Sequence, residues 1–115
     1  MELNAIMGHI LDAIPYPVVF VDTEHVIRYL NKRARYHYHQ ERGYRDLIGK
    51  SVFDCHCPES RKMIEEAVEG LRNHGQEIFL KVNARNERVY ITPVRDGDGN
   101  LVGYFERFEK NFTKT

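Results

Sequence analysis

The chain has 115 residues, of which 42% are hydrophobic, and its 17 basic and 17 acidic side chains give a formal net charge of zero. This length supports one hydrophobic core and is too short for two domains. A mixed, neutral surface creates no field that attracts phosphate backbones or anionic lipids, so we expect neither nucleic acid nor a membrane as partner.

The cysteines and the N-terminus favour a cytoplasmic location. No apolar run approaches the roughly 20 residues of a membrane helix, and no basic region followed by an apolar run begins the chain, as it would in a signal peptide. Cys55 and Cys57 are separated by one residue, which is poor geometry for a disulfide. Both observations agree with a reducing compartment.

Residues 1–14 are predicted to form a helix. Its apolar side chains recur at spacings of three and four, and they are Leu3, Ile6, Met7, Ile10, Leu11 and Ile14. Pro15 and Pro17 end the helix. Because so short a helix is marginal in water, the apolar stripe must pack on a partner surface. That surface is either this domain, the simpler expectation, or the same stripe of a second copy.

Residues 17–31 are predicted to form the first β-hairpin. Val18 to Val21 and Val26 to Leu30 are runs of residues that favour strands, and the polar stretch of residues 22–25 separates them. Asn31 can then cap a helical segment over residues 32–40. His37 and His39 do not share a face of a helix, so they form a metal pair only if this segment is extended.

A longer helix follows. Pro58 suits the first helical position, and Asn73-His74-Gly75 suits the C-terminal cap. One apolar stripe connects them, made of Met63, Ile64, Ala67, Val68 and Leu71. We expect this stripe to pack on a sheet.

Three further strands are predicted at the C-terminal end. Residues 78–84 alternate between apolar and polar side chains, and residues 89–94 and 101–108 continue the pattern after turns at 85–88 and 96–100. The result is an α+β fold with a five-stranded antiparallel sheet, with helices inserted between strands 2 and 3 and a flanking N-terminal helix.

Three stretches stand out by their residues and their order in the chain: residues 17–22 with Ile27 and Asn31, residues 47–50, and residues 93–96 and 98–100 with Gly103. They resemble, in turn, the opening hairpin, the turn into the central helices and the closing hairpin of the PAS domain family. The resemblance covers about residues 10–109. The order and spacing of these motifs are more specific than any one of them.

The resemblance implies a sensory or interaction module, with a ligand pocket between the sheet and the helices and with signalling through dimer packing. It implies no enzyme activity. The chain departs from the family at residues 109–113, where many members couple the last strand to an effector. No kinase, cyclase or DNA-binding segment follows, so we expect either an excised sensor or a partner that carries the effector.

Haem is the one specific cofactor that the sequence leaves as an alternative. The Asn-Cys-Arg context that forms flavin adducts in related photoreceptors is absent, so flavin adduct chemistry is not expected. A haem-based gas or redox sensor would use His56 as the axial ligand, since some haem-binding relatives take their histidine from this region. The simpler alternative is that His56 caps the helix or satisfies a buried carbonyl. If His56 does not bind haem iron, we expect no metal site, and the sequence does not identify a cofactor.

The predicted domains are the N-terminal helix (1–14), the sensor domain (15–110) and a tail (111–115). We expect a homodimer that binds a small apolar or mixed-polarity molecule. A ligand-free dimerisation or protein-docking module remains the alternative. From apolar periodicity and the resemblance, the predicted ligand-binding residues are Tyr36, Phe53, His56, Met63, Ile64, Ala67, Leu80 and Ile91.

Overall fold

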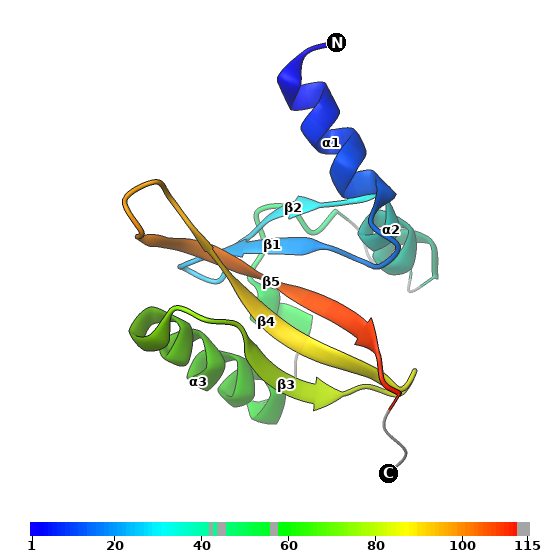
Figure 1. Cartoon of the computed structure of the whole chain (residues 1–115). Helices are drawn as coiled ribbons and strands as arrows, with labels where there is room; N and C mark the ends of the chain where they lie inside the picture. The colour runs from blue at the N-terminus through cyan, green and yellow to red at the C-terminus, as the bar shows by residue number, and fades with distance from the viewer. Residues whose placement is uncertain (42, 44–45, 56–57, 113–115) are drawn as a thin grey trace.

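A computed structural model describes residues 1–41, 43, 46–55 and 58–112. The chain forms one sheet with helices against one face (Figure 1). In chain order the elements are α1 (Leu3–Ala13), β1 (Val19–Asp22), β2 (Ile27–Leu30), α2 (Lys32–Arg35), the π-helix η1 (Tyr36–Glu41), the 3-10 helix η2 (Val52–Cys55), α3 (Pro58–His74), β3 (Ile78–Val82), β4 (Glu87–Arg95) and β5 (Leu101–Lys110).

The five strands are antiparallel and lie in the order β2-β1-β5-β4-β3. The first and last strands of the chain are hydrogen-bonded neighbours, with Val21 opposite Tyr104. A Cβ on Gly103 of β5 would collide with the carbonyl oxygen of Val21 and the ring of Phe20, so glycine permits this close pairing. The predicted antiparallel sheet, with helices between its second and third strands, is confirmed.

The core lies between α3 and the sheet. Ile64, Ala67, Val68 and Leu71 are buried, as the helical stripe predicts. Met63 is 45% exposed, because it lies about 100° around the helix from Ile64 and falls outside the arc that faces the sheet. The other buried side chains of the same core cluster are Val21, Ile27, Leu30, Ala34, Ile91 and Tyr104.

Asn31 joins three elements from a fully buried position. Its side-chain oxygen accepts hydrogen bonds from the backbone N–H of Val18 and of Ala34, each at 2.9 Å. Its amide nitrogen donates to the carbonyls of Leu11, at 2.9 Å, and Tyr16, at 3.2 Å. The predicted helix cap is therefore confirmed, and the same side chain also fixes the end of α1 and the start of the hairpin.

The segment after Asn31 differs from the prediction. The α-helix ends at Arg35, and residues Tyr36–Glu41 continue as a π-helix. This run is rich in Tyr and His, which have weak α-helix propensity. The wider turn changes the direction of each following side chain and directs Tyr38 toward the sheet.

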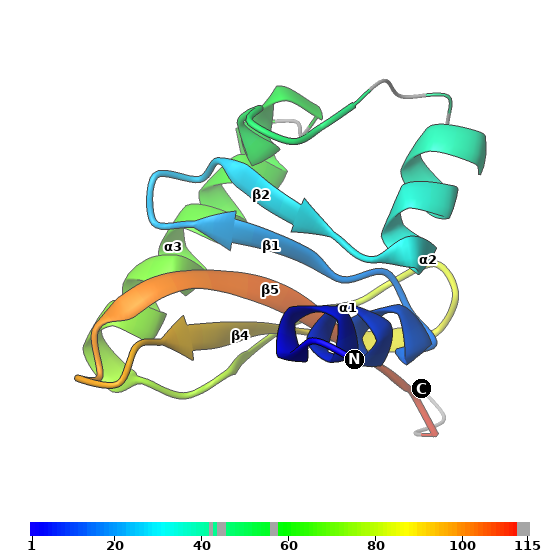
Figure 2. The ribbon, with the colours of Figure 1, turned by 90° about the horizontal axis from the view of Figure 1, so that it is seen from above.

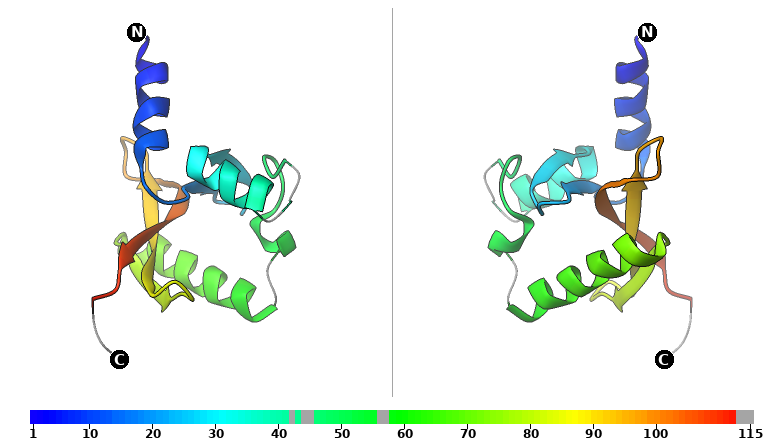
Figure 3. Two further views of the ribbon diagram at one scale, coloured as in Figure 1. Left: turned by 90° about the vertical axis from the view of Figure 1, so that its right-hand side faces the viewer. Right: turned by 90° about the vertical axis from the view of Figure 1, so that its left-hand side faces the viewer.

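The helix α1 projects away from the rest of the chain. Figure 2 shows it foreshortened in front of the sheet, and Figure 3 shows it extending past one end of the sheet, away from the helices that cover the inner face. Most of its apolar stripe is open to solvent, with Leu3 69%, Met7 51% and Ile10 60% exposed, whereas Leu11 and Ile14 at its C-terminal end are half-buried. The simpler expectation, that the stripe packs on its own domain, is therefore wrong for its N-terminal part. Among the described residues, no helix is long and apolar enough to cross a bilayer.

Candidate ligand-binding site

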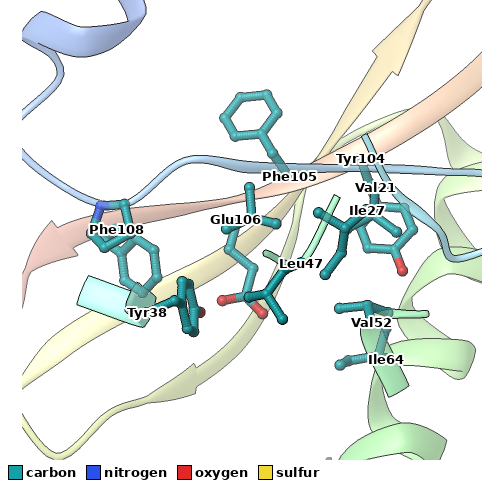
Figure 4. A pocket seen from close by; sticks show the side chains of 12 residues that line it. Val21, Ile27, Tyr38, Leu47, Val52, Ile64, Tyr104, Phe105, Glu106 and Phe108 are labelled. Carbon is teal, nitrogen blue, oxygen red and sulfur yellow. The ribbon is translucent and has the colours of Figure 1, made fainter. Parts of the chain in front are cut away.

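An apolar cavity of about 110 Å³ lies between the inner face of the sheet and the helices. We call it the inner cavity. Figure 4 shows side chains from β1, β2, η1, η2, α3 and β5 around it. The lining residues are Pro17, Val19, Val21, Ile27, Tyr38, Leu47, Val52, Ile64, Tyr104, Phe105, Glu106 and Phe108.

Strand β5 supplies the polar atoms of the inner cavity. Tyr104, Glu106 and Phe108 lie two residues apart along the strand and point toward the helices (Figure 4). The ring of Phe105, between them, points away (Figure 4). Burial raises the pKa of the Tyr104 hydroxyl well above its ordinary value. Tyr104 therefore stays neutral at physiological pH and can donate or accept a hydrogen bond.

His25 contacts the Tyr104 hydroxyl. Its Nδ1 lies 2.8 Å from that hydroxyl, and its ring packs on Phe53 with centroids 4.7 Å apart. His25 has a φ of 65° in the β1–β2 turn, and its carbonyl accepts a hydrogen bond from the N–H of Val52. His25 therefore connects Tyr104, which lines the inner cavity, to η2.

Burial lowers the pKa of His25 below its ordinary value. The positive charges of Arg72 and Arg61 act in the same direction, while Glu65 and Asp22 oppose them. The neutral imidazole is therefore favoured near pH 7.

A second, larger hollow opens beside the inner cavity. It has a volume of about 690 Å³ and lies between the α2–η1 segment and the β3–β4 turn. Pro17, Tyr38, Glu106 and Phe108 line both spaces. Unlike the inner cavity, the larger hollow carries basic side chains, namely Arg33, Lys81 and Arg85.

The predicted ligand-binding residues lie in several places. Ile64 lines the inner cavity, and Tyr36 lines the larger hollow. Ala67 and Ile91 are buried in the core, and Phe53 and Leu80 pack against it. Met63 is exposed on α3. His56, the remaining residue of this set, lies outside the described residues, as does Cys57, and the structure describes no side chain for Cys55.

Most of the inner-cavity residues were absent from the predicted set. The alternation of Tyr104, Glu106 and Phe108 could have identified the inner face of β5, since residues two apart share a face. The sequence does not show that β5 pairs with β1 in the middle of the sheet. That pairing places β5 beneath the helices.

No metal-binding group of three or more His, Cys, Asp or Glu side chains occurs among the residues that the structure describes. The inner cavity is also smaller than the roughly 300–1,000 Å³ of pockets that enclose drug-sized ligands. In this conformation the inner cavity has room for a small molecule.

The fold is thus an antiparallel sheet with short helices that enclose a small apolar cavity on one face. The sequence profile of the PAS domain family matches residues 7–110. The chain therefore belongs to the PAS domain family, a family of sensory and signalling modules.

Solved structures share this fold at low sequence identity. A C-terminal domain from Streptococcus mutans is 22% identical with a TM-score of 0.70, covering 90% of this chain and 81% of that chain. A PAS domain from Colwellia psychrerythraea is 16% identical with a TM-score of 0.68, covering 95% and 97%. A sensory box sensor histidine kinase from Vibrio cholerae is 14% identical with a TM-score of 0.64, covering 93% and 90%. The chain matches none of the curated proteins.

Proposed function

We propose that this PAS domain is a cytoplasmic, non-catalytic sensor that binds a small apolar or mixed-polarity molecule in the inner cavity. The observation that carries the proposal is the cavity itself, because close-packed cores leave few voids larger than a water molecule. Its apolar walls favour apolar groups, and the Tyr104 hydroxyl can orient one polar atom. The similarity in fold to a sensor histidine kinase supports a sensory role.

The size of the inner cavity limits the ligand. An apolar protein cavity of about 150 Å³ binds benzene or xenon. At about 110 Å³, the inner cavity fits a ligand no larger than benzene unless the helices move outward. A volatile or very small metabolite is the class that this space accepts.

The signal is proposed to pass through a homodimer formed by α1 and the outer face of the sheet. The exposed stripe on α1 has the spacing of a helix-pairing seam. On the outer face, Arg107 binds Glu77 through two hydrogen bonds of 2.7 and 3.0 Å and lies over the Tyr90 ring. A ligand that moves β1 or β5 would shift the helix before β1 and the tail after β5. The effector would be fused to the domain or carried by a separate partner.

Xenon binding tests the sensor proposal. We expect xenon to shift the methyl resonances of Ile64 and Val21 in NMR spectra of the full chain. Val19→Phe, which fills the inner cavity, should abolish these shifts, and Ile64→Phe, observed at Val21, should do the same. Val102→Phe is the matched control, because Val102 is exposed on β5 outside the cavity. Shifts that persist in both filled variants, or none in the parent protein, would refute a ligand site here.

A second measurement separates a sensor from a docking module. We expect the dimer dissociation constant or the mobility of the Asn111 amide to change under saturating xenon. A stable dimer with neither change would leave the mechanical signal without support and would favour a ligand-free dimerisation module.

A further inference from the structure

The larger hollow beside the inner cavity differs from that cavity in the residues that line it. We call this hollow the basic groove. Its floor is the inner face of the sheet, where the register places Lys81, Val89 and Phe108 on one line across β3, β4 and β5. The α2–η1 segment forms one wall, and Ala84 and Arg85 of the β3–β4 turn form one end.

The cations of the basic groove lack partners. The side chains of Arg33 and Arg85 form no ion pair, hydrogen bond or ring contact with the described residues. Every other arginine that the structure describes places its guanidinium against a carboxylate or a carbonyl oxygen. Lys81 forms no ion pair there either. The two partnerless guanidinium groups of this set therefore line the same groove.

The carboxylates of the basic groove are already engaged. Glu87 accepts a hydrogen bond of 3.0 Å from the side-chain amide of Asn83. Glu106 has an interaction partner within the protein. Each carboxylate of the groove thus has a partner, whereas the guanidinium groups of Arg33 and Arg85 have none among the described residues, and these cations favour an anion.

Aromatic rings provide the apolar surface of the basic groove. Tyr16 and Phe108 pack edge to face with centroids 5.6 Å apart, and both line the groove. Tyr36, on η1, also lines it and is 60% exposed. Aromatic side chains of this kind favour an aromatic ligand, which can pack on their faces or edges.

We propose that the basic groove binds a small planar aromatic molecule with a carboxylate, the carboxylate pairing with Arg33 and Arg85. Guanidinium groups match carboxylates in geometry and form strong charge-assisted hydrogen bonds with them. This site adjoins the inner cavity and shares part of its lining, but Arg33 and Arg85 line only the basic groove. Its volume of about 690 Å³ accommodates a two-ring molecule, which the inner cavity excludes.

Two probes of nearly equal shape test the proposal. Naphthalene-2-carboxylate has the ring and the charge, and naphthalene-2-carboxamide has the ring without the charge. In NMR titrations of the full chain, we expect the carboxylate to shift the amide resonances of Lys81, Arg85 and His37. The carboxamide should bind at least about tenfold more weakly, because it lacks the charge-assisted bonds.

A charge-matched pair of variants identifies the groups that bind. Arg33→Gln with Arg85→Gln should weaken carboxylate binding about tenfold or more and leave carboxamide binding unchanged. Lys32→Gln with Lys50→Gln removes the same charge from exposed positions outside the groove and should change neither affinity by more than about twofold.

Three outcomes would overturn the proposal. The first is equal affinity for the carboxylate and the carboxamide. The second is an unchanged carboxylate affinity in the variant of Arg33 and Arg85, or an equal loss in the control pair. The third is a set of shifted amides that lies on α1 and not around the groove. Xenon binding in the inner cavity is measured separately, so either site can fail alone.

Discussion

Asn111 and Asn86 bind each other at the point where the chain leaves the sheet. The Asn111 N–H donates to the Asn86 carbonyl at 3.1 Å, and its side-chain amide donates to the Asn86 side-chain oxygen at 3.1 Å. The Asn86 side-chain amide donates to the Asn111 carbonyl at 3.2 Å. Asn86 lies in the β3–β4 turn, so the turn that closes the basic groove also holds the start of the tail.

Asn86→Gly is expected to release the tail without disturbing the turn. Glycine adopts the φ of 58° found at Asn86 without strain, but it removes both side-chain hydrogen bonds. We expect a loss of about 1 kcal/mol in the free energy of unfolding. The amide of Asn111 should also become more mobile in NMR relaxation measurements.

Asn86→Ala separates the loss of the side-chain hydrogen bonds from the strain of a positive φ. It removes the same hydrogen bonds and adds the strain of a positive φ, so it should destabilise the protein more than Asn86→Gly does. Both variants should increase the mobility of the Asn111 amide to the same extent. An Asn111 amide that stays as rigid as in the parent protein would show that other contacts hold the tail.

Asn31→Ala is expected to be strongly destabilising. The substitution leaves the buried N–H groups of Val18 and Ala34 and the carbonyl of Tyr16 without their Asn31 partner, while the Leu11 carbonyl keeps only the N–H of Ile14. Unsatisfied buried groups cost about 1–3 kcal/mol each, so we expect a total loss of about 3 kcal/mol or more in urea denaturation. Asn4→Ala on the exposed face of α1 is the control and should change stability by less than about 0.5 kcal/mol. A loss below about 1 kcal/mol for Asn31→Ala would contradict this role.

The sequence predicts the sheet and α3 well because each has a regular apolar period. Ile64, Ala67, Val68 and Leu71 repeat at helical spacing and form the buried face of α3. The cap by Asn31 was also predicted, because capping depends on local residue type.

The site was harder to predict because it depends on non-local pairing. Glu106 reaches the inner cavity because β5 pairs with β1, and no local pattern shows which strands are neighbours. Tyr38 reaches it because a π-helix replaces the expected α-helix. The packing of α1 was also misjudged, since an apolar stripe shows that a partner surface is needed but not which molecule supplies it.

The stability of the protein is expected to depend on His25 below about pH 6.5, the ordinary pKa of a histidine. Burial lowers the pKa of His25 in the folded state, so the unfolded chain binds a proton at a higher pH than the folded chain does. Below the unfolded pKa of about 6.5, protonation therefore favours unfolding, and stability rises with pH until that value is passed.

His25→Asn tests this dependence. Asparagine tolerates the positive φ of this turn but does not titrate. We expect the stability difference between the parent and His25→Asn proteins, measured by urea denaturation, to favour the parent less as the pH falls from 7 to 5. The other histidines contribute to both proteins and cancel in the difference. A difference that does not vary with pH would show that His25 has the same pKa in both states.

The exposed stripe on α1 is expected to hold the proposed homodimer. Ile6→Glu with Ile10→Glu places two charges in the seam, whereas Ala5→Glu with His9→Glu adds them at the same spacing on the opposite face. Losing two apolar anchors costs about 3 kcal/mol or more. We therefore expect the seam variant to dissociate with a dissociation constant at least about 100-fold higher, as measured by analytical ultracentrifugation.

The control variant should dimerise within about threefold of the parent protein, because its charges lie in solvent. Both variants should keep the fold, since α1 contributes no buried residue. A seam variant that remains fully dimeric would place the interface on the outer face of the sheet, where Arg107 and Glu77 form their ion pair. Arg107→Glu would then break the dimer, and the packing of α1 could no longer carry the signal.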